Sequence, residues 1–74
     1  MAPLRPLTFR EVKRKLEAAG FTEHSQKGSH VKFVKQTNDG IATAIVPHHR
    51  EVTAGTQRSI LRQAGISLDE WEDL

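Results

Sequence analysis

The stretch GSHVKFVKQTNDGIATAIVP, residues 28–47, decides the fold because it holds two strand patterns around one turn signal. Polar and apolar side chains alternate at the start of residues 29–36, which predicts a half-buried strand. The tripeptide NDG at 38–40 is a hairpin turn signal. Residues 41–46 are rich in β-branched side chains, which favours a second strand, and Pro47 ends it. The stretch therefore predicts an antiparallel hairpin.

A helix is predicted before this hairpin. Thr8 and Glu11 have the spacing of a capping box, in which each side chain binds the backbone N–H of the other residue. Gly20 ends the helix, and Phe21 is placed to contact Leu16 as in a Schellman ending. The apolar stripe between these signals has helical spacing and consists of Phe9, Val12, Leu16 and Ala19.

A second helix is predicted over residues 54–64, with Thr53 as its N-cap and Gly65 just past its end. Its buried face has the helical spacing i, i+3, i+4 and i+7 and consists of Gln57, Ile60, Leu61 and Ala64. The pattern Ser67-Leu-Asp-Glu70 predicts a further short C-terminal helix. Trp71 in that helix is either a core anchor, which we favour, or a protein-contact residue.

A weak strand at residues 21–26, ended by the turn signal Lys27-Gly28, completes the order α-β-β-β-α plus the short C-terminal helix. We therefore expect an α+β fold with a three-stranded antiparallel sheet and both helices on one face. The other face of the sheet is expected to be open to solvent or a ligand. Residues 1–7, with two of the three prolines, are predicted to be a flexible arm, and residues 8–74 a single domain.

The composition of these 74 residues excludes several functional classes. The chain has no cysteine, which excludes disulfides, thiolate catalysis and cysteine-bound metal. No apolar run reaches membrane-spanning length, and residues 1–7 lack the apolar core of a signal peptide, so we expect a cytoplasmic protein without membrane contact. Residues 1–68 carry eleven basic and five acidic side chains, a formal +6, and four acids follow. This pattern favours a polyanion such as RNA as partner, although a solvated charged surface is also compatible with it.

His30 is the candidate catalytic residue. Val31 and Phe33 are expected on the core face, which places His30 and Lys32 on the open face. Gly28 allows close backbone approach, and Ser29 adds a hydroxyl. An exposed imidazole beside lysines suits acid–base chemistry on an RNA phosphodiester, with Lys27 and Lys32 stabilising the phosphate charge. A plain surface histidine is the other interpretation.

Further basic residues are candidates for contact with the RNA backbone. His48, His49 and Arg50 follow Pro47 in a loop, where they contact phosphate or simply supply loop polarity. Arg58 and Arg62 lie on the outer face of the second helix. No histidine or carboxylate spacing of a known metal site appears, so neither a metal nor a small-molecule cofactor is expected. The three phenylalanines argue against a base-stacking platform because all three fall on predicted core faces: Phe9, Phe21 and Phe33.

The segments TFREVKRKLEAAGF (8–21), GSHVKF (28–33) and VPHHREVTAGTQRSILRQAGIS (46–67) resemble the HicA toxin family, also called YcfA-like proteins. The resemblance implies a double-stranded-RNA-binding-domain-like fold, a metal-independent endoribonuclease that cleaves mRNA, and a HicB-like antitoxin as partner. It places the catalytic histidine at His30 and matches His49 to the family's Pro-x-His position. Two other functions remain open: a non-catalytic RNA-binding module of the same fold, or a protein-binding adaptor.

Overall fold

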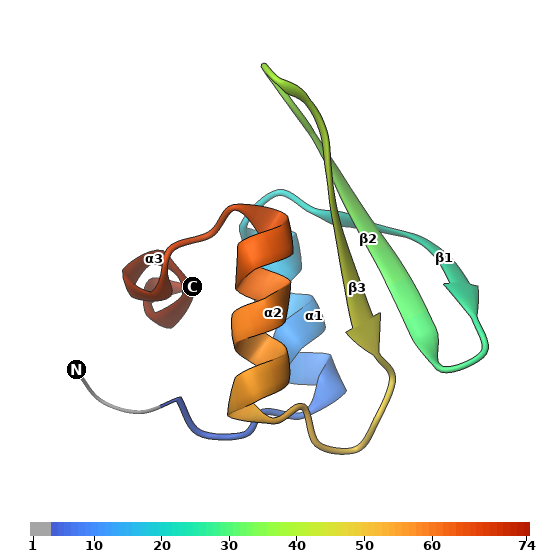
Figure 1. Cartoon of the computed structure of the whole chain (residues 1–74), viewed down its shortest axis with the longest axis vertical. Helices are drawn as coiled ribbons and strands as arrows, with labels where there is room; N and C mark the ends of the chain where they lie inside the picture. The colour runs from blue at the N-terminus through green and yellow to red at the C-terminus, as the bar shows by residue number, and fades with distance from the viewer. Residues whose placement is uncertain (1–3) are drawn as a thin grey trace.

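The computed structural model describes residues 4–74 of the chain (Figure 1). The elements follow the predicted order, with bounds within one or two residues of those expected from the sequence. They are α1 (Phe9–Ala18), β1 (Thr22–Lys27), β2 (His30–Thr37), β3 (Gly40–Pro47), α2 (Ala54–Ala64) and α3 (Leu68–Asp73). The α+β class with a three-stranded antiparallel sheet is therefore confirmed.

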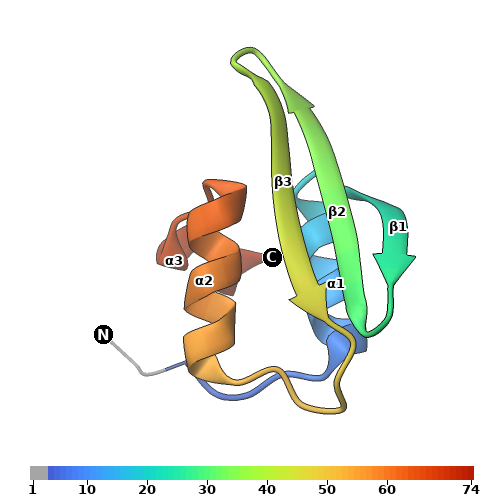
Figure 2. The ribbon, with the colours of Figure 1, turned by 45° about the vertical axis from the view of Figure 1, so that its right-hand side comes forward.

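The sheet has the order β1-β2-β3, so β2 is its central strand. Both α1 and α2 lie on one face of this sheet, as Figures 1 and 2 show from two directions. Val31 and Phe33 of β2 are 1% and 0% exposed, which confirms that they face the helices. Strand alternation then turns His30 and Lys32 to the face without helices. The sheet thus has one buried and one open face.

The predicted signals at the two ends of α1 form as expected. Thr8 Oγ1 accepts a hydrogen bond from the backbone N–H of Glu11, and Glu11 Oε2 accepts one from the backbone N–H of Thr8. The nitrogen–oxygen distance is 3.1 Å in both. At the other end Phe21 N–H donates to the Leu16 carbonyl at 2.9 Å, the long bond of a Schellman ending. The helix end is also tied to the sheet, because Lys35 Nζ of β2 donates to the Ala19 carbonyl at 2.7 Å.

The two edge strands of the sheet are irregular in different ways. In β1 the register shifts between Glu23 and Ser25, which makes His24 the extra residue of a bulge. In β3 the backbone N–H of Ile45 donates to the side-chain oxygen of Gln63 of α2 at 3.0 Å. A side chain of the helix layer therefore satisfies a backbone donor of the edge strand.

The segment before α1 is fastened to the domain. Leu7 and Val52 exchange two backbone hydrogen bonds in an antiparallel bridge. Gln57 Nε2 donates to the carbonyls of Arg5 and Val52, at 2.8 and 3.1 Å. Within the flexible arm expected over residues 1–7, residues 1–3 lie outside the described part of the chain. Residues 5–7 are held in place because these bonds join them to the start of α2.

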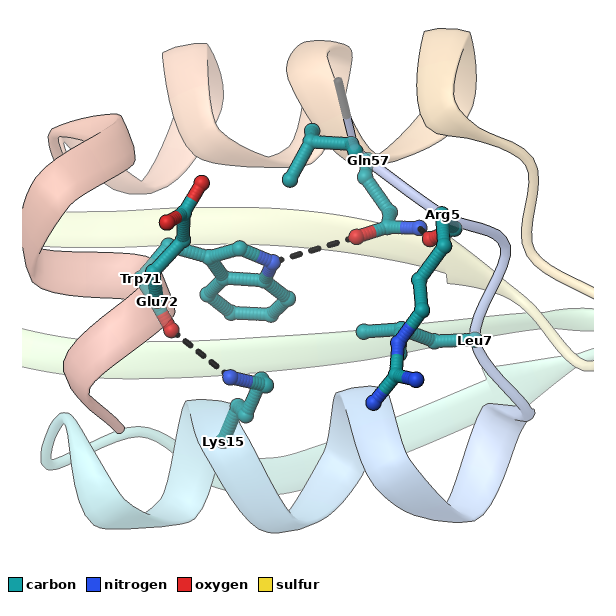
Figure 3. A pocket seen from close by; sticks show the side chains of 7 residues that line it. Arg5, Leu7, Lys15, Gln57, Trp71 and Glu72 are labelled. Atoms are coloured by element: carbon teal, nitrogen blue, oxygen red, sulfur yellow. Dashed lines mark hydrogen bonds between the residues drawn. The ribbon is translucent and has the colours of Figure 1, made fainter. Parts of the chain in front are cut away.

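The C-terminal helix α3 places Trp71 next to Gln57 and Arg5 (Figure 3). Trp71 is 1% exposed, which confirms it as a core anchor, and its indole N–H donates to Gln57 Oε1 at 3.1 Å. Lys15 Nζ of α1 donates to the carbonyls of Trp71 and Leu74, at 2.8 and 3.2 Å. Burial, followed by the positive charge of Arg14, lowers the pKa of Lys15. We call this network of Arg5, Lys15, Gln57 and Trp71 the terminal clasp.

Candidate functional site

The predicted site motif lies at the turn between β1 and β2. Gly28 and Ser29 form a two-residue loop, and Gly28 has a φ of +60°, a conformation that L side chains rarely adopt. A Cβ atom at Gly28 would meet no other atom within 4 Å. The glycine is therefore required by backbone conformation and not by lack of space. The carbonyl of Ser29 accepts the N–H bond of His48, which ties this turn to the loop after β3.

His30 is exposed and is the first residue of β2. Its partners across the sheet are Lys27 in β1 and Pro47 in β3. Residues directly opposite in an antiparallel pair point to the same face, with Cα atoms about 5 Å apart. His30 and Lys32 therefore share the open face as predicted, and the pairing across the turn adds Lys27 to that face. Among residues 4–74 no side chain forms a hydrogen bond or ion pair with the His30 imidazole, which leaves both ring nitrogens available to a ligand.

The two arginines of α2 lie away from this group. Arg58 and Arg62 are exposed, and α2 buries its opposite side, including Ile60 and Leu61, toward the core. They belong to the helix layer, whereas His30 lies on the sheet face turned away from the helices. The fold does not bring these arginines together with His30, because α2 packs under the sheet rather than beside its turn.

A recess next to the β1–β2 turn contains residues that sequence reasoning does not bring together. The imidazole of His48 stacks on the ring of Phe9, with the ring centres 3.9 Å apart and the planes 23° apart. Phe9 is only half-buried. The expectation that the phenylalanines lie on core faces is confirmed: Phe21 and Phe33 are buried, and half-buried Phe9 packs against the same core cluster while its ring also contacts His48.

The recess is bordered by the start of α1 and the loop after β3. Most of its lining side chains are basic, and none of them is acidic. The lining residues are Thr8, Phe9, Arg10, Lys13, His48, His49 and Arg50. Lys13 forms an ion pair with Glu23 of β1 at 3.0 Å, and the hydrogen bond to this carboxylate raises the pKa of Lys13. His49 and Arg50, predicted from the sequence, are thus gathered with Arg10, which was not. No sequence signal pairs the first turn of α1 with this loop, because their contact is tertiary.

The acidic residues of the tail are kept away from both surfaces. Four carboxylates belong to α3, namely Asp69, Glu70, Glu72 and Asp73. In both Figure 1 and Figure 2, α3 lies across α2 from the sheet, at the opposite side of the molecule from β1. The β1–β2 turn and the recess are therefore basic in a chain of net charge +2.

No helix within residues 4–74 has both the length and the apolar character needed to cross a membrane. Within the same residues no three histidine or acidic side chains gather closely enough to hold a metal ion.

Comparison with known families identifies the chain. A family model described as HicA toxin of bacterial toxin-antitoxin matches residues 9–66, more than three quarters of the 74 residues. The chain belongs to the HicA toxin family. A search of curated proteins gives no match. The resemblance seen in the sequence is confirmed. The matched HicA region contains the whole sheet, α1, α2, the Gly28-Ser29-His30 turn and every residue that lines the recess except Thr8.

The HicA match also separates two parts of the molecule. The region from α1 to α2 is the part that the family model describes, whereas α3 and the segment before α1 lie outside it. The terminal clasp joins these flanking parts to two residues inside the matched region, Lys15 and Gln57. Membership of the HicA family supports a role as the toxin of a toxin–antitoxin pair.

Proposed function

We propose that this HicA protein is a metal-independent endoribonuclease that cleaves mRNA, with His30 as its acid–base residue. The observation that carries the proposal is the position of His30, exposed on the open sheet face directly opposite Lys27 and two residues from Lys32. Histidine exchanges protons near neutral pH, and two nearby ammonium groups stabilise the charge that builds on a phosphate during attack.

The proposed reaction is a transesterification within the RNA chain. The 2′-oxygen of a ribose attacks the adjacent phosphorus, the bond from phosphorus to the 5′-oxygen breaks, and a 2′,3′-cyclic phosphate and a 5′-hydroxyl are left. His30 accepts the proton of the 2′-hydroxyl or delivers a proton to the departing 5′-oxygen. Lys27, Gly28, Ser29 and Lys32 surround the reacting phosphate.

The remaining sequence candidates act as contacts for the RNA backbone. His49 and Arg50 line the recess beside the turn, so they serve the same RNA strand as His30. Arg58 and Arg62 of α2 would contact a more distant part of the substrate, since they lie in the helix layer. The proposed protein partner is a HicB-like antitoxin, and the proposed location is the cytoplasm.

The test is cleavage of RNA by the purified protein, by a His30→Ala variant and by the exposed control His24→Ala, with a chelator present. We expect His30→Ala to slow cleavage about a hundredfold to ten-thousandfold, the range for loss of an acid–base group, while His24→Ala cleaves at the wild-type rate. The fragments should end in 2′,3′-cyclic phosphate.

Three results would contradict the proposal. Wild-type protein that binds RNA without cutting it would identify a binding module. Absence of RNA binding even at low salt, where phosphate contacts are strongest, would identify an adaptor. Equal cleavage by His30→Ala and wild type would remove His30 from the reaction.

A further inference from the structure

The recess beside the β1–β2 turn contains a stacked ring and arginines, and the proposed function gives a role only to its His49 and Arg50. Three aromatic rings lead from the core to its surface. Phe33 is 0% exposed, Phe9 lies next to it with ring centres 6.4 Å apart, and exposed His48 stacks on Phe9. Because Phe9 covers one face of the imidazole, the open side of this column is the second face of His48.

Positive charge lines the same recess as His48. Arg10 comes from the first turn of α1, and Arg50 comes from the loop two residues after His48. Lys13 is already paired with the Glu23 carboxylate at 3.0 Å, so within residues 4–74 Arg10 and Arg50 are the lining arginine and lysine side chains of the recess that have no ion pair. A planar ring and two guanidinium groups that line one recess suit a base and its phosphates, because bases stack on flat side chains and arginine binds phosphate in a fork geometry.

The recess adjoins the proposed catalytic residue. His48 donates its backbone N–H to the Ser29 carbonyl. This hydrogen bond continues the β2–β3 pairing by one residue beyond the His30–Pro47 pair. Alternation turns His30 to the open sheet face and His48 toward α1. The two imidazoles therefore point to opposite faces at adjacent ladder positions, so an RNA strand would have to wrap around this end of the sheet to contact both, at different nucleotides.

We propose that the recess binds one unpaired nucleotide of the RNA substrate, next to the cleaved position. Its base stacks on His48, and its phosphates contact Arg10 and Arg50. The base must be unpaired because neighbouring base pairs cover both faces of a base inside a duplex. This inference rests on the proposed function for its substrate but makes a separate claim about how that substrate is held.

The test measures binding of a short, mixed-sequence, single-stranded RNA in which 2′-deoxy sugars prevent cleavage. A second oligomer has the same backbone without bases. We expect His48→Ala to weaken binding of the first oligomer about tenfold, within the range for loss of one base-stacking contact, and to leave binding of the abasic oligomer unchanged. His48→Phe should restore binding because it keeps a flat ring, and the exposed control His24→Ala should bind like wild type.

The proposed phosphate contact of Arg10 is tested with a variant of this residue and a control variant of Arg14, both on α1. Arg10→Ala should weaken both oligomers and reduce the slope of log affinity against log salt by about 0.7, the value for one single-strand phosphate contact. Arg14→Ala, one turn further along α1 and outside the recess, should leave the slope unchanged. Thermal unfolding of each variant checks that the fold is intact.

The two proposals fail in different ways. Equal binding of the base-containing oligomer by His48→Ala and wild type, equal loss on both oligomers, or failure of His48→Phe to restore binding would overturn the nucleotide site. So would equal salt slopes for Arg10→Ala and Arg14→Ala. Cleavage of natural RNA by the wild-type protein reports on the proposed nuclease alone, and the binding results stand whichever way that assay ends.

Discussion

The β1–β2 turn and the terminal clasp are built on opposite principles. At the turn, His30 is exposed, and the neighbouring Gly28 adopts a backbone conformation that few residues tolerate. In the clasp, Gln57 and Trp71 are buried, and within residues 4–74 every buried side-chain nitrogen and oxygen has a partner. The polar groups that stabilise this small domain are therefore separate from those available to a ligand.

Among the variants of the clasp, Trp71→Ala should reduce the free energy of unfolding most. Truncating a buried tryptophan costs about 3–5 kcal/mol, and a domain of this size is stable by only about 4–11 kcal/mol. We expect a loss of the free energy of unfolding of this size in urea titrations. RNA cleavage per folded molecule, measured at low temperature, should stay at the wild-type level because the turn lies outside the clasp.

The variant Trp71→Phe keeps a buried aromatic ring but removes the indole N–H donor to Gln57 and a small part of the ring volume. It should cost much less than Trp71→Ala. A loss of cleavage without a loss of stability in either variant would show that the clasp and the turn are coupled, and would break the comparison.

A smaller effect is expected from Gln57→Leu. The leucine fills similar space but leaves the buried Trp71 N–H without its acceptor and the Arg5 carbonyl without its donor. Leaving a buried polar group unsatisfied costs about 1–3 kcal/mol. The control Gln36→Leu, at an exposed position of β2, should change the free energy of unfolding by less than about 0.5 kcal/mol. Equal effects at both positions would show that the Gln57 network adds nothing.

A smaller change is expected in how the contribution of Lys15 to stability depends on pH. Burial lowers the pKa of Lys15 below 10.5, its value in the unfolded chain, so just below pH 10.5 the unfolded chain binds more protons. Stability contributed by this group therefore rises with pH in that interval. The difference in free energy of unfolding between wild type and Lys15→Met should increase as pH approaches 10.5, measured by urea titrations at a series of pH values.

Lys13 provides the opposite sign as a control. Its hydrogen bond to Glu23 raises its pKa, so its contribution is present below 10.5 and is lost as pH rises through the higher folded value. The difference between wild type and Lys13→Met should therefore decrease above pH 10.5. The same trend for both lysines would contradict the assignment of Lys15 to a desolvated position.

Much of this fold is predictable from the sequence because its signals are local. The Thr8–Glu11 box and the glycine at position 20 define α1 through bonds between residues a few positions apart. Even the burial of polar Gln57 follows from helical spacing. The exposure of His30 beside Lys27 and Lys32 is predictable for the same reason, since strand alternation and a two-residue turn determine it.

The contacts that escaped prediction join residues far apart in the chain. Lys15 and the Trp71 carbonyl are 56 residues apart, and Gln57 and Arg5 are 52 apart. The stacking of His48 on Phe9 is of the same kind. Periodicity assigns Phe9 to the apolar stripe of α1, but only the packed structure shows that its ring also contacts the loop after β3 through His48.

The Gln63 side chain on β3 has a consequence for association between molecules. Edge strands present free N–H and C=O groups on which another strand can form hydrogen bonds, the first step of edge-to-edge aggregation. Because Gln63 Oε1 accepts the Ile45 N–H bond, an incoming strand would have to displace this amide before pairing along β3. A single helix residue thus protects the edge of the sheet where Ile41 and Ile45 leave apolar surface exposed.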